Sequence, residues 1–345
     1  MALMNGTITV RRPRVRALEE RFVSRLLPLF QRCTPEVTTL LPTLYLHGLA
    51  LGDFELALRG LLGDGAPLST ISLVRLKATW QAQYAAWQQR DLADLCLAYL
   101  WADGVYVKAG LADRKAALLV LIGADADGQK RVLAVTSGQR ESMESWAAAL
   151  RDLKRRGLRA PKLTIADGHL GIWRGLAAVY PESAEQRCWN HKLRNVLDRV
   201  PQKHQAEVKV ALQAIANAET AHAATTLRDR FARTYRRPHP KAVERLAQDW
   251  DRMVAYYAFP REPWRHLRTT NVIESPFAAV RLRTSAAKRF KVVEHATALI
   301  WKTLLVVEHH FRKLNAAHLC AAVVEGIASP DGVRTTTPPR NRRAA

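Results

Sequence analysis

The chain has 345 residues, enough for two or three domains with a sizeable buried core. Its 53 Lys and Arg residues outnumber its 31 Asp and Glu residues, which gives a formal net charge of +22. Such an excess favours a polyanionic partner, nucleic acid above all, over a merely solvated basic surface. No apolar run could span a bilayer, no signal-peptide pattern is present, and four scattered cysteines lack a C-x-x-C spacing. We therefore expect no membrane partner, no disulfide framework and a cytoplasmic, nucleoid-associated protein.

Residues 1–92 are predicted to form an N-terminal DNA-binding region. Residues 7–16 are a β-prone, very basic arm that either lies along phosphates or is a solvated lead-in. A helix at 51–62, a Gly-containing turn and a helix at about 70–89 have the outline of a helix-turn-helix. An ordinary helical hairpin has the same outline. In that case the aromatic residues of the second helix are core residues: Trp80, Tyr84 and Trp87.

Residues 98–138 are predicted to form a three-strand meander. Its three runs are short, apolar and rich in β-branched residues, and the sequence DADG at 125–128 is a turn signal between the second and third runs. Asp103 lies inside the first run, where an unpaired carboxylate would be costly. Two interpretations remain open: Asp103 caps a turn beside Gly104, or it is a metal ligand.

A second aspartate, Asp167, ends the next predicted strand at 161–167. Amphipathic helices are predicted on either side of this strand, at 142–156 and from residue 170 onward. The order of elements predicts that Asp103 and Asp167 lie at the ends of two strands that could be neighbours. Paired carboxylates in that position suit hard divalent cations and a two-metal phosphoryl-transfer site.

Residues 185–195 are dense in polar side chains, and Cys188 and His191 would share one face of a helix. Zinc would need two more ligands, and the sequence has no second pair at a suitable spacing. Cys188 is then either a buried cysteine with an unrelated His191, or the two form a structural pair near the active site. Residues 198–262 are Ala-rich with helical periodicity, which predicts an all-helical insertion.

The stretch around Asn271 predicts a helix start. Asn271 is a good N-cap, and Glu274 would take the third helical position of a capping box. On the functional interpretation, Glu274 is a third carboxylate of the metal site and Arg281, seven residues on, lies near the same helical face. Residues 263–328 are assigned to C-terminal helices, and the Pro-, Arg- and Thr-rich residues 329–345 to a disordered tail.

Four ordered motifs carry a family resemblance: LWADGVYVK at 100–108, IADG at 165–168, QRCWNHK at 186–192, and RTTNVIES at 268–275 with RLRT following. The chain resembles the bacterial Mutator-type insertion-sequence transposases, which carry a DDE triad on a ribonuclease-H-like fold. The likeness runs from about Thr7 to Val333. Members of that family usually have a further helical segment before the basic arm, and Pro at the position of Val272.

The resemblance implies that Asp103, Asp167 and Glu274 are the triad and hold two Mg²⁺ ions, with Mn²⁺ as a substitute. It implies that Cys188 and His191 are the family's C-x-x-H pair, with Asn271 as a structural neighbour. The implied fold is α/β: a ribonuclease-H-like core (93–197 and 263–328), interrupted by the helical insertion and preceded by the N-terminal DNA-binding region. Candidate DNA contacts are basic or aromatic residues in or near the motifs: Arg187, Lys192, Arg194, Trp264, Arg268, Arg281, Arg283, Lys288 and Arg289.

The expected function is DNA cleavage at terminal inverted repeats followed by joining of the freed ends to target DNA. Because two ends must be brought together, we expect a homo-oligomer on double-stranded DNA. One alternative is a truncated, inactive copy that binds the repeats and represses. Another is a ribonuclease-H-like nuclease that recognises DNA structure.

Overall fold

A computed structural model of the chain describes residues 2–3, 6–7, 35–49, 53, 70–109, 115–138, 141–287 and 290–335. The strands are β1 (Ala2–Leu3), β2 (Gly6–Thr7), β3 (Leu97–Lys108), β4 (Lys115–Asp125), β5 (Lys130–Gly138), β6 (Leu163–Ala166) and β7 (Ala184–Arg187). The α-helices of the first half are α1 (Pro35–Leu46), α3 (Thr70–Gln88), α4 (Met143–Arg155), α5 (Leu170–Val179) and α6 (Trp189–Leu197). Those of the second half are α7 (Gln202–Ala216), α8 (Ala221–Tyr235), α9 (Pro240–Ala247), α10 (Trp250–Val254), α11 (Trp264–Leu267), α12 (Asn271–Glu274), α13 (Phe277–Ala287), α14 (Val293–Glu308) and α15 (Leu319–Glu325). The 3₁₀ helices η2 (Ala255–Ala258) and η3 (Pro330–Gly332) lie in the described part of the second half.

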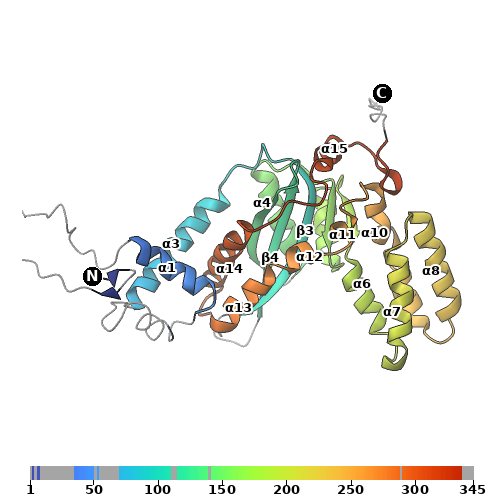
Figure 1. The fold of residues 1–345 in the computed structure, drawn as a ribbon, viewed down its shortest axis with the longest axis horizontal. Coiled ribbons are helices and arrows are strands. Elements are labelled where there is room, and N and C mark those ends of the chain that lie inside the picture. Colours follow the sequence, from blue (N-terminus) through green and yellow to red (C-terminus); the bar gives the residue numbers. More distant parts are fainter. Residues whose placement is uncertain are drawn as a thin grey trace, which may run out of the picture.

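A five-stranded mixed sheet stands at the centre of the molecule, in the order β5-β4-β3-β6-β7 (Figure 1). The predicted meander is confirmed, since β3, β4 and β5 pair antiparallel in succession. Its second turn is closed by Asp125, whose side chain accepts hydrogen bonds from the backbone of Asp127 and Gln129. Gly128 has φ +70°, which explains why glycine stands there. β6 and β7 extend the sheet in parallel, and the polar strand β7 is one that the sequence analysis does not predict.

Both faces of the sheet are covered, which explains why the strand sequences are almost continuously apolar. Along β3, Tyr99 and Trp101 face one hydrophobic core and Leu100 and Ala102 face a second. The second core lies against α4 and α5. The predicted helix at 142–156 is confirmed as α4, with Ser142 as the N-cap that accepts from the backbone N–H of Ser145.

Helices α3 and α14 pack on the first face of the sheet. The phenol of Tyr84 on α3 donates to the carbonyl of Val135 on β5 at 2.6 Å, and its ring and that of Trp87 lie against Trp301 of α14. Trp80 is buried as well. The aromatic residues of α3 are therefore core residues. Of the first predicted helix of the hairpin, at 51–62, only residue 53 is among the described residues.

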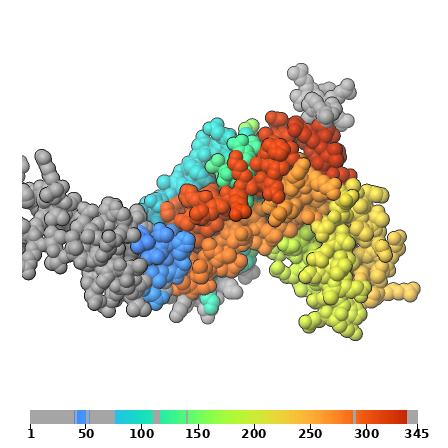
Figure 2. Space-filling model, in the orientation of Figure 1, coloured from blue at the N-terminus to red at the C-terminus, as the bar shows by residue number. Residues whose placement is uncertain are grey.

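Residues 198–262 contain helices and no strand, in agreement with their predicted helical periodicity. Helices α7 and α8 form a lobe at the end of the molecule opposite α1 and α3 (Figures 1 and 2). Residues 329–335 pack on this lobe, so the prediction of a disordered tail is wrong for them: Asp331 accepts from the backbone N–H of Ala221 at 2.8 Å. Among the described residues, no helix is both long and apolar enough to cross a bilayer.

Candidate active site

Asp103 lies in the middle of β3, so the prediction that it ends its strand is wrong. β3 continues to Lys108 because it stays paired with β4 along that whole length. On its other side β3 pairs with β6 only as far as Ala102, opposite Ala166. Asp103 is thus the first residue of β3 without a partner on β6. β3 extends beyond Asp103 because β4, its antiparallel partner, continues as an apolar strand opposite those residues.

Asp167 is the residue that follows β6, and the register places it next to Asp103. Because side chains alternate along a strand, both carboxylates belong to the face that carries Trp101 and Ile165. Gly168 then turns the chain with φ +99°, and Asp167 accepts a hydrogen bond from the backbone N–H of His169 at 2.9 Å. The prediction that the two aspartate-bearing strands are neighbours is confirmed.

Glu274 ends the short helix α12, whose buried Val272 and Ile273 pack it against the sheet. The helix begins one residue earlier than predicted: the N-cap is Thr270, not Asn271, and Glu274 is therefore not at a capping-box position. The Thr270 hydroxyl instead donates to the Glu274 carboxylate.

The helix stops after Glu274, and a new one, α13, starts at Phe277. Pro276 stands in this break and has no N–H to continue the helical ladder. Arg281 is thus on a different helix from Glu274. The seven-residue spacing does not place the two on one helical face, and that prediction is wrong.

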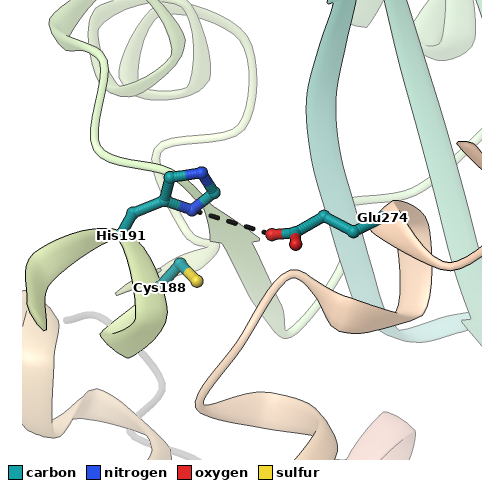
Figure 3. Close-up of side chains that lie close together, drawn as sticks. All are labelled: Cys188, His191 and Glu274. Atoms are coloured by element: carbon teal, nitrogen blue, oxygen red, sulfur yellow. Dashed lines mark ion pairs between the residues drawn. The ribbon is translucent and has the colours of Figure 1, made fainter. Parts of the chain in front are cut away.

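Cys188 and His191 lie beside Glu274, and their side chains face it across a narrow gap (Figure 3). The Nδ1 atom of His191 is 3.8 Å from Oε1 of Glu274. The fully buried sulfur of Cys188 accepts from the backbone N–H of Thr270 at 3.3 Å and lies 3.2 Å from the Thr270 hydroxyl. Asn190 and Asn271 join the same two segments through a side-chain hydrogen bond of 3.0 Å. These contacts connect the start of α6 to the start of α12. Cys188 and His191 therefore both lie at the Glu274 segment, and the interpretation of Cys188 as a buried cysteine with an unrelated His191 is wrong.

The electrostatics show an excess of negative charge at this place. Burial raises the pKa of the Asp103 carboxyl from 3.8 to about 7; the backbone N–H of Gly104 lowers it, while Asp167 and Glu274 raise it further. A hydrogen bond with Cys188 raises the pKa of His191 to about 9, against the opposing effect of burial, and the two aspartates add to the rise. The raised pKa favours the protonated form of His191, next to carboxylates that repel one another. Such an arrangement can hold a further cation.

Comparison with known proteins identifies the family. The family model described as "Transposase, Mutator family" matches residues 2–313. This chain belongs to the Mutator family of transposases. It is 43% identical over 290 residues to the transposase for insertion sequence element IS6120 of Mycolicibacterium smegmatis, which covers 84% of this chain and 90% of that protein. It is 41% identical over 279 residues to the transposase for IST2 of Acidithiobacillus ferrooxidans, covering 80% and 94%. Identity to the transposase for ISRM5 of Rhizobium meliloti is 28% over 308 residues, covering 88% and 75%.

One carboxylate near the site, Glu141, was not predicted from the sequence; it lies beside Gly104 and interacts electrostatically with Asp167. It is only 9% exposed, and a Cβ on Gly104 would lie 2.7 Å from its carboxyl carbon. Burial raises the pKa of Glu141, a hydrogen bond with Tyr106 lowers it, and Asp167 raises it further. The available signal was Gly104 itself, because a glycine inside an apolar strand often marks the close approach of another group.

Several candidate DNA contacts of this Mutator-family chain are buried. They are Arg187, Lys192, Trp264 and Arg283. Lys192 donates to the carbonyl of Gln248, Trp264 donates to that of Phe259, and Arg283 donates to that of Leu49. These side chains join elements of the fold to one another.

The remaining candidates differ in their surroundings. Arg268 is partly buried and donates to the side chain of Asn217 at 2.7 Å. Arg194 and Arg281 are exposed; Arg194 lies on α6, which also carries His191, and Arg281 lies on α13, which follows α12 in the chain. Lys288 and Arg289 lie outside the described residues.

Proposed function

We propose that this chain is the transposase of an insertion sequence, with Asp103, Asp167 and Glu274 as a DDE catalytic triad. The observation that carries the proposal is the parallel register of β3 and β6, which brings the two aspartates together. Glu274 reaches the same region on α12, where it lies near His191. The family supports the reaction, since relatives of this chain are named as transposases for insertion sequence elements.

We infer that the sheet and its helices form a ribonuclease-H-like core. An antiparallel meander followed by two parallel strands, with helices on both faces, supports this fold. The helical insertion 198–262 lies between the strand that precedes α6 and the segment that supplies Glu274. We further propose that residues 1–92 bind the terminal inverted repeats, supported by the charge of the chain and its basic arm at 7–16. Because α3 packs its aromatic face on the core, any DNA contact from α3 uses its other faces.

The donor set fits Mg²⁺, with Mn²⁺ as a substitute. Asp103, Asp167 and Glu274 offer only carboxylate oxygens, which hard dications prefer. Burial, and to a lesser extent repulsion by Asp167 and Glu274, raises the pKa of Asp103, and a bound dication would offset this cost of ionising the carboxyl. When bound, two Mg²⁺ ions supply Lewis-acid activation of the attacking oxygen and neutralise charge on the leaving oxygen.

The residues around the triad have distinct roles in this proposal. His191 holds a positive charge close to Glu274 and reduces the repulsion among the carboxylates before a metal enters. Cys188 and Thr270 keep α6 and α12 at a fixed separation, which preorganises the third carboxylate. Arg194 and Arg281 are exposed, and we assign them to contacts with DNA phosphates. Because an element has two ends, we propose that the chain acts as a homo-oligomer on DNA.

The test uses purified full-length protein and a labelled duplex that carries the inverted repeat read from the DNA flanking the element. We expect Mg²⁺-dependent strand cleavage at the repeat and joining of the cut end to a target plasmid. Asp103→Ala, Asp167→Ala and Glu274→Ala should each abolish both steps while duplex binding in a mobility-shift assay persists. Asp127→Ala, an exposed carboxylate in the β4–β5 turn, is the matched control and should cleave normally.

Two outcomes would contradict the proposal. Tight binding to the repeat with no cleavage in Mg²⁺ or Mn²⁺ would identify a repressor. Cleavage of branched or hybrid substrates without preference for the repeat, and without joining, would identify a structure-specific nuclease.

A further inference from the structure

Arg187 is a buried cation directly beneath the turn that carries Asp167. It lies at the end of β7, opposite Ala166 in the parallel register with β6, and its side chain is 4% exposed. Gly168 rests on it: a Cβ at that position would lie 2.7 Å from the guanidinium carbon of Arg187. A side chain at position 168 would therefore collide with the guanidinium group of Arg187.

The helical insertion holds this guanidinium group in place. Nη1 of Arg187 donates to Oδ2 of Asp249 at 2.7 Å. Asp249 lies between α9 and α10 with φ +58°, a left-handed conformation that is costly for a residue other than glycine. Its other oxygen accepts from Arg252 at 3.2 Å, and Arg252 is also paired with Glu185 of β7. The carboxylate of Asp249 thus contacts two arginines, Arg187 at the end of β7 and Arg252 on α10.

No other carboxylate among the described residues forms an ion pair with Arg187. Its Nε atom is buried and has no hydrogen-bond partner in the described part of the chain. Lys192, buried nearby, donates to the carbonyl of Gln248, the residue before Asp249. Removing the charge of Asp249 would therefore leave the guanidinium group beneath Gly168 without its ion-pair partner, and breaking a buried ion pair by removing one partner is strongly destabilising.

We propose that Arg187 is a positioning residue for Asp167, and that Asp249 makes the helical insertion a working part of the carboxylate site. This inference rests on the proposed function, in which Asp167 is a metal ligand. The insertion is then more than a spacer between the strands and Glu274. A displacement of α9 against α10, for example on DNA binding, is transmitted through Asp249 and Arg187 to the turn that bears the second carboxylate.

The experiment compares Asp249→Asn and Arg187→Lys with the control Asp229→Asn. Asp229 forms an exposed ion pair of 2.7 Å with Arg228 in the same insertion, so the control removes equivalent chemistry without touching the sheet. Mn²⁺ binding is measured in the full-length protein by the loss of the free-ion electron paramagnetic resonance signal. Cleavage of the inverted-repeat duplex is measured over a range of Mn²⁺ concentrations.

We expect both variants to weaken Mn²⁺ binding by about tenfold or more, as the loss of groups that orient metal ligands commonly does. Cleavage should fall at low Mn²⁺ and recover at high Mn²⁺, while duplex binding stays at the wild-type level. A purely structural role would instead lower the melting temperature and leave the Mn²⁺ titration of the folded fraction unchanged. Arg187→Lys keeps the buried positive charge, so its Mn²⁺ binding and cleavage test the inference if Asp249→Asn fails to fold.

The inference is overturned if Asp249→Asn, or Arg187→Lys in its place, binds Mn²⁺ and cleaves like Asp229→Asn. The variant Asp167→Asn in the same assays separates this failure from a failure of the proposed function. If Asp167→Asn binds Mn²⁺ as the wild type does, then the assignment of the carboxylates is wrong. If Asp167→Asn loses Mn²⁺ while Asp249→Asn keeps it, then only the connection through Arg187 is wrong.

Discussion

Asp103→Asn should make the metal-free protein more stable at alkaline pH while it abolishes strand cleavage. The raised pKa of Asp103 means that the folded chain favours the protonated carboxyl. That contribution to stability is complete below the unfolded pKa of about 4 and is lost as the pH rises through about 7. Above pH 7 the wild type therefore bears the full cost of a buried charge among other carboxylates. Asparagine is neutral at every pH and can still accept the 2.8 Å hydrogen bond from Gly104.

The expected gain in the free energy of unfolding follows from the shift in the pKa of Asp103. A rise from 3.8 to about 7 corresponds to a ceiling of about 4 kcal/mol in the free energy of unfolding. The cost is shared with the neighbouring carboxylates and screened by solvent at this partly exposed site, so we expect a gain of about 1–2 kcal/mol. For a chain of this size, that is a rise of a few degrees in melting temperature.

The assay is thermal unfolding followed by circular dichroism, with a chelator present, at pH 5 and pH 8. The Asp103→Asn variant should melt higher than the wild type at pH 8, and the difference should shrink at pH 5. Added Mg²⁺ should stabilise the wild type more than the variant, because a ligand that binds the native state shifts its stability. Asp127→Asn, in the exposed turn, controls for the loss of an ordinary carboxylate. An Asp103→Asn variant whose difference from the wild type is the same at both pH values would refute the reasoning.

Other predictions follow from the site and the charge of the chain. Affinity for any DNA duplex should fall steeply as the salt concentration rises, through counterion release. An affinity that does not change with salt in a binding titration would contradict the prediction that the chain binds DNA. Cys188→Ser should reduce cleavage and leave duplex binding nearly intact; one stoichiometric zinc per chain, lost in the variant, would show that the C-x-x-H pair is a metal site instead. Glu274→Gln should abolish cleavage in Mg²⁺, whereas Glu262→Gln and Glu294→Gln, both exposed, should cleave normally, and the reverse pattern would move the third carboxylate. Ser142→Ala should lower the free energy of unfolding by about 1 kcal/mol through loss of the α4 cap, measured by denaturant titration.

The sequence alone determined the features that depend on near neighbours in the chain. Apolar runs with β-branched residues and a DADG turn predicted the meander, and an apolar stripe behind Ser142 predicted α4. These patterns act over a few residues, so they are readable without the fold. The sequence motifs named Asp103, Asp167 and Glu274 as candidates. The parallel register of β3 and β6 shows that Asp103 and Asp167 lie side by side.

Tertiary contacts decided what local patterns could not. The strand β7 has the sequence AEQR, with none of the composition of a strand, and it forms because β6 offers it an edge. Glu141 comes near the carboxylates only because Gly104 leaves room for it. Arg187 was a candidate DNA contact on its sequence, and the fold makes it a buried ion-pair partner of Asp249, far along the chain. Charge and residue type are properties of the sequence, but the burial that sets their energy depends on elements that meet only when the whole chain is packed.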